Sequence, residues 1–224
     1  MKPARTVVNR SPHRSVGLAV GTRLQSALTD HESGPEKSFV VVAGVCMGVK
    51  CIEPQPFKLQ WTDAEGKLRS YVPDYRVTFI DGTQMTFEVK PTKFVAKNEL
   101  RFDQASRQLA RAHQSFVVVT EHHLTDARVE MAQLWRRYRS SELPKDFVEL
   151  ATRMVNDGTT WADACASEVP LHVWFGLLGR RQFSIESADL RSDTRLLNAH
   201  EFKEHDPQVH IQRWFGCSPW RPRL

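Results

Sequence analysis

Two acidic residues and a lysine have the types and the spacing of a site that could hold a metal ion. Asp74 follows Pro73, and Glu88-Val89-Lys90 comes fourteen residues after Asp74. Carboxylate oxygens are the hard ligands that a divalent cation prefers. A lysine beside them supplies a positive charge for a phosphate group or for an attacking water. Together these groups could hydrolyse a phosphodiester, provided that all three side chains lie on one face of a sheet.

Apolar and polar residues alternate through both segments, which is typical of half-buried strands. The apolar side chains fall at odd positions in 75–79 and in 85–89. The even positions carry Asp74, Glu88 and Lys90. The alternation therefore predicts a hairpin with one apolar face and one polar face, and it places the three reactive side chains together on the polar face.

Asp81-Gly82 marks the turn between the two strands. A two-residue turn would pair odd with even positions and send each apolar set to the wrong face. A three-residue loop with Gly82 in a left-handed G1 bulge pairs odd with odd, and it sets Asp74 directly across from Glu88 or one diagonal step away. Cross-strand Cβ atoms are roughly 5 Å apart directly and roughly 7–8 Å apart on the diagonal, so a cation or a proton must neutralise the two carboxylates.

The composition of the 224 residues, with 25% charged and 41% hydrophobic residues, is that of a folded protein with a core. The longest apolar run, 39–49, is too short to cross a bilayer, and the N-terminus has no apolar signal segment, so we expect a cytoplasmic protein. The four cysteines contain no Cys-x-x-Cys pair, which argues against structural zinc. The sequence has no Walker lysine motif and no dinucleotide fingerprint, which argues against nucleotide binding.

Positive charge is concentrated at both ends of the chain. The net charge is +5, and residues 1–29 hold five basic and no acidic residues. Within this arm, Arg10, Arg14 and Arg23 are candidate contacts to a nucleic-acid backbone. Basic residues also close the chain beside Trp214 and Trp220. The alternative for both ends is a disordered or merely solubilising terminus.

The order of predicted elements indicates an α/β fold in which a mixed sheet is flanked by helices. The expected elements are a helix over 33–47, a strand over 50–61 broken by prolines, the hairpin, a helix over 96–113 and a buried strand over 115–120. A helix over 125–138 carries Arg136 and Arg137, two further candidate DNA contacts. Three short helices over 144–155, 160–167 and 170–178 and a strand over 183–185 then predict a small winged-helix-like domain. Its third helix is nearly all apolar, which indicates core packing or a protein contact.

These patterns predict four parts of the chain. They are a basic arm over 1–32, a nuclease-type domain over 33–140, a helical winged-helix-like domain over 141–195, and a basic, aromatic tail over 196–224.

The arrangement of Pro-Asp on one strand and Glu-x-Lys on the next resembles the core of the restriction-endonuclease-like PD-(D/E)xK nucleases. Four spaced motifs narrow the resemblance to TnsA, the endonuclease subunit of heteromeric transposases, over about residues 10–120. The motifs are Ser33-x-x-Glu36-x-x-Phe39, Gln55-Pro56-Phe57, Tyr71-x-Pro73-Asp74-Tyr75 and Glu88-Val89-Lys90.

The resemblance implies a role for each matching residue. Glu36, Asp74 and Glu88 would be catalytic acids that bind Mg²⁺, for which Mn²⁺ could substitute, and Lys90 would be the catalytic lysine. Glu36 has an alternative role, because Ser33-x-x-Glu36 is also a helix capping box. Gln55 would either orient a metal-bound water or act as a structural amide before a proline.

The resemblance also implies a function in bacterial transposition at the nucleoid. Such a subunit cuts the 5′, non-transferred strands at transposon ends, while a DDE-type transposase cuts and joins the 3′ strands. An AAA+ ATPase regulator would be a further partner, with Trp214, Phe215 and Trp220 as docking residues. Two alternatives remain open, which are an independent nuclease of the resolvase or restriction type and a non-catalytic DNA-binding adaptor.

Overall fold

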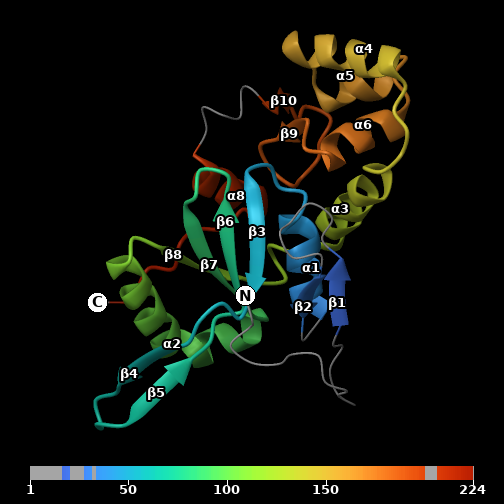
Figure 1. Cartoon of the computed structure of the whole chain (residues 1–224). Helices are drawn as coiled ribbons and strands as arrows, with labels where there is room; N and C mark the ends of the chain where they lie inside the picture. Colours follow the sequence, from blue (N-terminus) through green and yellow to red (C-terminus); the bar gives the residue numbers. More distant parts are fainter. Residues whose placement is uncertain (1–16, 21–27, 32–33, 200–205, 224) are drawn as a thin grey trace. The chain divides into compact units, whose positions relative to one another are not determined.

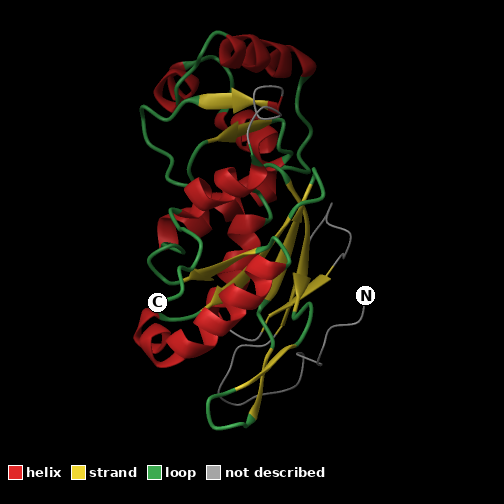
Figure 2. Ribbon diagram, turned by 90° about the vertical axis from the view of Figure 1, so that its left-hand side faces the viewer, coloured by secondary structure: helices red, strands yellow, loops and turns green. Residues whose placement is uncertain are grey.

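The structure is a computed structural model that describes residues 17–20, 28–31, 34–199 and 206–223 (Figure 1). Arg10, Arg14 and Arg23, predicted as DNA contacts, lie outside the described residues. The described chain contains both helices and strands (Figure 2), and it divides into two compact units. Unit 1 consists of Met1–Val40, Val49–Leu124 and Cys217–Leu224, and unit 2 of Val41–Gly48 and Thr125–Gly216.

A four-stranded mixed sheet forms the centre of unit 1. Its strands are β3 (Val49–Pro54), β6 (Tyr75–Phe79), β7 (Gln84–Val89) and β8 (Ser115–Val119), in the spatial order β3-β6-β7-β8. β6 is antiparallel to both β3 and β7, whereas β8 is parallel to β7. Parallel neighbours need a long crossover, and α2 (Thr92–Arg111) provides it. The predicted α/β class with a mixed sheet, consistent with a restriction-endonuclease-like fold, is confirmed.

The β6–β7 hairpin has the predicted register. Tyr75 pairs with Phe87 and Val77 pairs with Met85, so odd positions face odd positions. The backbone N–H of Phe79 donates to the Thr83 carbonyl at 2.9 Å, which leaves a three-residue loop over 80–82. Gly82 adopts a φ of 87°, the left-handed conformation that the bulge requires.

The apolar face of the sheet packs against α1 (Gly34–Ala43). The ring of Phe39 lies 5.1 Å from the rings of both Tyr75 and Phe87, measured between centroids. The helix is shorter than the predicted span of 33–47. It ends at Ala43 because glycine follows at position 44, and Gly48 then takes a left-handed φ of 84° as the chain turns into β3.

The alternation of residues suggested that the polar face of the hairpin is open to solvent. In the structure, part of this face is covered. α2 contacts β8, and Phe102 of α2 packs against Phe116 of β8 with the ring centroids 5.8 Å apart. Thr86 and Glu88 on the same face of the sheet are fully or almost fully buried. When helices cover both faces of a sheet, the side chains that point to either face are buried. α2 begins four residues earlier than predicted, directly after Pro91, whose φ of −54° suits a helix start.

Two further hairpins belong to unit 1. β4 (Leu59–Thr62) pairs with β5 (Leu68–Tyr71), and this hairpin extends beside α2 (Figure 1). β1 (Gly17–Val20) pairs with β2 (Leu28–His31) inside the segment expected to be a basic arm. The chain's last residues also return to unit 1, where Pro219 bridges to Val117 of β8.

Unit 2 is mainly helical. It contains α3 (Asp126–Tyr138), α4 (Lys145–Asn156), α5 (Trp161–Ala166), α6 (Leu171–Gly179), the strands β9 (Phe183–Ile185) and β10 (Leu196–Asn198), and α8 (Pro207–Phe215). β9 and β10 form an antiparallel hairpin, and a bridge joins Thr160 to Arg195. α6 buries Trp174 and Leu177 almost fully, which agrees with core packing, one of the two alternatives that its apolar sequence left open. The winged-helix assignment itself stays a prediction.

The compact units do not coincide with the four predicted parts. α3 belongs to unit 2 rather than to the nuclease domain, and residues 196–224 divide between both units instead of forming one tail. Trp214 and Phe215, expected to dock on a partner, are buried at 1% and 0% exposure inside unit 2. The Trp214 ring is tilted against that of Trp135, with the centroids 5.7 Å apart, and its Nε1–H donates to the Val42 carbonyl at 3.2 Å, so Trp214 serves as a core residue. Within the described residues, no helix is long and apolar enough to cross a membrane.

Candidate active site

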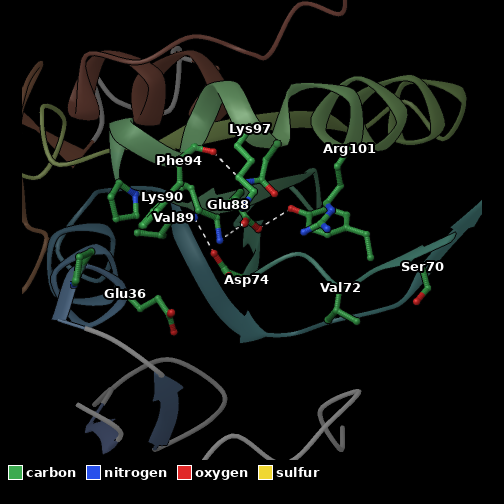
Figure 3. A pocket seen from close by; sticks show the side chains of 14 residues that line it. Glu36, Ser70, Val72, Asp74, Glu88, Val89, Lys90, Phe94, Lys97 and Arg101 are labelled. Carbon is green, nitrogen blue, oxygen red and sulfur yellow. Dashed lines mark hydrogen bonds and ion pairs between the residues drawn. The ribbon is translucent and has the colours of Figure 1, made fainter. Parts of the chain in front are cut away.

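Asp74 and Glu88 come together at the end of the β6–β7 hairpin. Asp74 immediately precedes β6, and extending the register by one pair sets it directly across from Glu88. Asp74 Oδ2 accepts a hydrogen bond from the Val89 backbone N–H at 2.8 Å, which turns its carboxylate toward the end of β7. Figure 3 shows Asp74, Glu88 and Lys90 directed toward one another. The prediction that strand alternation would gather these side chains is confirmed.

The carboxylate of Glu88 is buried, with 3% exposure, and a different donor holds each of its oxygens. Lys90 Nζ lies 2.7 Å from Oε1, and the hydroxyl of Tyr71 donates to Oε2 at 2.5 Å. Burial, together with the negative charges of Glu88 and Asp74, raises the pKa of Tyr71 well above its ordinary value. The phenol therefore keeps its proton and remains a donor to Glu88.

Negative charge accumulates around Asp74. Burial, then the charge of Glu88, then the charge of Glu36, raise the pKa of Asp74 well above its usual range. Lys90 and the hydrogen bond from Val89 act in the opposite direction and do not cancel this effect. A site with excess negative charge on hard oxygen atoms attracts a cation.

Lys90 remains a cation in this environment. Burial lowers its pKa, but the charges of Glu88 and Asp74 outweigh burial, so the pKa of Lys90 is raised. Its ammonium group can therefore contribute a fixed positive charge to the site at neutral pH.

Glu36 lies on α1 at one side of the site, apart from the other three residues (Figure 3). It is near enough to influence the pKa of Asp74 and of Lys90. Among the described residues, however, no three His, Cys, Asp or Glu side chains are grouped closely enough to hold a metal ion. Ser33, the other half of the alternative capping box, lies outside the described residues.

The donor set fits a divalent metal ion at Asp74 and Glu88. Each carboxylate oxygen has two lone pairs, so the hydrogen bonds that Glu88 accepts leave capacity for a cation. Burial and then the charges of Glu88 and Glu36 raise the pKa of Asp74, and a cation bound at this carboxylate would offset both effects. Glu36 adds negative charge from the side of the site.

These residues form the floor of a cleft of about 750 Å³. One wall is a single face of α2, where Phe94, Lys97 and Arg101 recur at the spacing of successive helical turns. Lys97 and Arg101 are exposed. The Arg101 guanidinium lies over the Tyr71 ring, 5.9 Å from its centroid. The sequence patterns did not point to Lys97, Arg101 or the Tyr71 hydroxyl, although the spacing of 94, 97 and 101 is that of one helical face.

The remaining candidate residues lie elsewhere. Gln55 is buried, with a left-handed φ of 46°, and its backbone N–H donates to the Asp74 carbonyl at 2.8 Å. It is not among the residues that line the cleft, so its visible contribution is to the backbone next to Asp74. Arg136 and Arg137 lie at the end of α3 in unit 2, where burial lowers the pKa of Arg136.

Comparison with protein families identifies the domain that carries the site. Residues 47–121 match the model of the TnsA-like endonuclease N-terminal domain. This segment, less than half of the chain, is similar to the TnsA-like endonucleases. The matched segment contains Asp74, Glu88 and Lys90 but not Glu36. A TnsA-like domain implies a nuclease of the transposase family, which binds DNA and acts with a transposase. A search of curated proteins gave no match.

Proposed function

We propose that this TnsA-like chain is a metal-dependent endonuclease subunit that hydrolyses the 5′, non-transferred strands at transposon ends. A DDE-type transposase would cut and join the 3′ strands, so that the two activities together excise the element. The observation that carries this proposal is the group formed by Asp74, Glu88 and Lys90, which lies in the cleft of a TnsA-like domain.

Asp74 and Glu88 would hold Mg²⁺, for which Mn²⁺ would substitute. When bound, this ion would polarise the scissile phosphate and favour deprotonation of a water. Lys90 places a positive charge within 2.7 Å of Glu88, where it can neutralise charge that develops on the phosphate. Glu36 contributes to the negative field that attracts the ion.

The walls of the cleft fit a nucleic-acid backbone. Lys97 and Arg101 project from α2 on the face that lines the cleft, where they can neutralise phosphates beside the acidic floor. Without such cations, the floor would repel a DNA strand. Phe94, which is 44% exposed, adds an aromatic surface to the same wall.

The proposal includes two protein partners. The transposase would supply the complementary strand cuts, and an AAA+ ATPase would regulate assembly. Because Trp214 and Phe215 are core residues, we no longer assign them to a docking surface.

The test uses full-length protein with the transposase and transposon-end DNA that is labelled separately on each strand. We expect cutting of the 5′ strand only, dependent on Mg²⁺ or Mn²⁺, and no such cutting with Asp74→Asn. If Asp74→Asn cuts the 5′ strand at the normal rate, the assignment is wrong. If the chain alone cuts both strands of unrelated DNA, the independent-nuclease alternative is correct.

A further inference from the structure

The hydroxyl of Tyr71 makes one of the shortest polar contacts in the cleft. It donates to Glu88 Oε2 at 2.5 Å, which is the length of a charge-assisted hydrogen bond between a phenol and a carboxylate. Glu88 is buried, so water cannot readily replace this donor. Lys90 already occupies the other oxygen of Glu88. The two donors together fix the rotation of the carboxylate.

The Tyr71 ring is held independently of its hydroxyl. Tyr71 ends β5 and pairs with Leu59 of β4. Its ring meets the edge of Phe116 with centroids 6.3 Å apart and an interplanar angle of 86°, and it belongs to the apolar cluster beneath α2. A rigid ring aims the hydroxyl at Glu88, and this geometry connects the β4–β5 hairpin to the metal-binding residues.

The Tyr71 ring also lies close to a cation. The guanidinium of Arg101 lies 5.9 Å from the ring centroid, within the range of a cation–π contact. Arg101 lines the same cleft as Glu88. The ring therefore supports the positive wall of the cleft while the hydroxyl supports the acidic floor.

We propose that Tyr71 is a positioning residue with two separable roles: its hydroxyl orients Glu88 for metal binding, and its ring holds Arg101 toward the DNA phosphates. This inference rests on the proposed nuclease function and assigns a role that the metal-binding residues alone do not show. Tyr71 acts through Glu88 and Arg101 and does not itself touch the reacting atoms.

The two roles can be separated by substitution. Tyr71→Phe removes the hydroxyl and keeps the ring, so it alters only the contact with Glu88. We expect Mn²⁺ affinity and kcat each to fall about tenfold, as is typical when a residue that orients a metal ligand is lost. We expect KM for DNA to remain within about twofold, because the ring still supports Arg101.

Arg101→Ala should give the opposite pattern. We expect about tenfold weaker DNA binding, with the slope of log affinity against log salt reduced by about 0.9 for one lost phosphate contact. Mn²⁺ affinity should be unchanged. Arg111→Ala is the matched control, because Arg111 is exposed near the end of the same helix and does not line the cleft.

Mn²⁺ binding is measured on full-length protein without DNA, from the electron paramagnetic resonance signal of free Mn²⁺, at a temperature well below the unfolding midpoint. Tyr138→Phe removes a hydroxyl in unit 2 and serves as the control for Tyr71→Phe.

A second measurement leaves Tyr71 unsubstituted. The protein is labelled with 3-fluorotyrosine, and the fluorine resonance of Tyr71 is followed as Mg²⁺ is added. We expect this resonance to shift in the wild type and not in Asp74→Asn.

The role of the hydroxyl would be overturned if Tyr71→Phe bound Mn²⁺ as tightly as the wild type does. It would also be overturned if the Tyr71 fluorine resonance did not shift when Mg²⁺ is added. Unchanged DNA binding in Arg101→Ala would overturn the role of the ring. Failure of the proposed function is distinguishable, because Asp74→Asn would then retain cleavage. If Asp74→Asn is inactive while Tyr71→Phe behaves as wild type, only the inference about Tyr71 fails.

Discussion

Both units bury charged side chains, but they balance these charges in different ways. In unit 2, Arg128 forms two hydrogen bonds with Asp189, from Nε to Oδ1 at 2.7 Å and from Nη2 to Oδ2 at 2.5 Å. Its Nη1 also donates to the Phe215 carbonyl at 2.6 Å. In unit 1, Asp74 experiences the negative charges of Glu88 and Glu36 more strongly than the positive charge of Lys90.

The two aspartates consequently shift in opposite directions. The hydrogen bonds from Arg128 lower the pKa of Asp189, whereas burial and then neighbouring acids raise the pKa of Asp74. A matched pair such as Arg128–Asp189 fastens one segment of the fold to another. Ionising Asp74 in the cleft has an energetic cost, which is the pattern found at functional sites more than in structural ion pairs.

The largest expected effect comes from removing the charge of Asp74. Asp74→Asn should reduce strand cleavage by about 1,000-fold or more, because a proposed ligand of the metal ion is lost, and that factor corresponds to about 4 kcal/mol of activation free energy. The amide oxygen can still accept the hydrogen bond from Val89. In the presence of a chelator, the free energy of unfolding should therefore stay the same or rise by about 1 kcal/mol, since a like-charge repulsion is removed. Gel assays of cleavage and urea denaturation measure the two quantities.

A loss of stability in Asp74→Asn comparable with that of a core substitution would contradict this expectation. Asp193→Asn is the control, because Asp193 is exposed in unit 2.

Removing the carboxylate of the Arg128–Asp189 pair in unit 2 should lower the free energy of unfolding, in contrast to Asp74→Asn. Asp189→Ala leaves the guanidinium of Arg128, which is 9% exposed, without its carboxylate. We expect the free energy of unfolding to fall by about 2 kcal/mol, at the low end for a broken buried pair because Asp189 is itself partly exposed. Chemical denaturation measures this change, with Asp193→Ala as the control. An unchanged unfolding midpoint would show that Arg128 does not depend on Asp189.

Glu36→Gln tests how far the negative charge of the cleft extends. Glu36 influences Asp74 electrostatically but does not form a close metal-binding group with the other acids. We expect cleavage to fall about tenfold, equivalent to about 1.4 kcal/mol, because the field that attracts the cation is weakened. Titration of the rate against Mg²⁺ should show a higher metal requirement, and Glu149→Gln in α4 is the control. A loss as large as that of Asp74→Asn would instead identify Glu36 as a direct ligand.

The smallest effect concerns pH. The lowered pKa of Asp189 means that its ionised form stabilises the fold. This contribution is complete above the unfolded-state pKa of about 3.9 and is lost as pH falls through the lower folded-state pKa. The stability difference between wild type and Asp189→Asn should therefore be largest near neutral pH and shrink in acid. A difference that grows below about pH 4 would contradict the assigned sign.

The sequence by itself determined the hairpin and the group of residues at its end. Alternation with a period of two fixes which side chains share a face, and it excludes a two-residue turn at Asp81-Gly82, which would separate the apolar residues. These are local constraints, so they require no knowledge of the rest of the molecule. For this reason Asp74, Glu88 and Lys90 were predicted correctly as neighbours.

Tertiary structure decided which residues surround that group. The contact from Tyr71 to Glu88 spans 17 residues, and the one from Trp220 Nε1 to Asp103 Oδ1, at 2.7 Å, spans 117. Trp220 also packs on Phe102, with the ring centroids 5.3 Å apart, so its contacts are with unit 1 rather than with a partner protein. Aromatic residues among basic ones suit a partner surface and a core equally well. Which apolar side chains are buried is decided by how the helices and the sheet pack against one another. The hydrophobic effect depends on the total apolar area removed from water, and the local sequence pattern does not give that area.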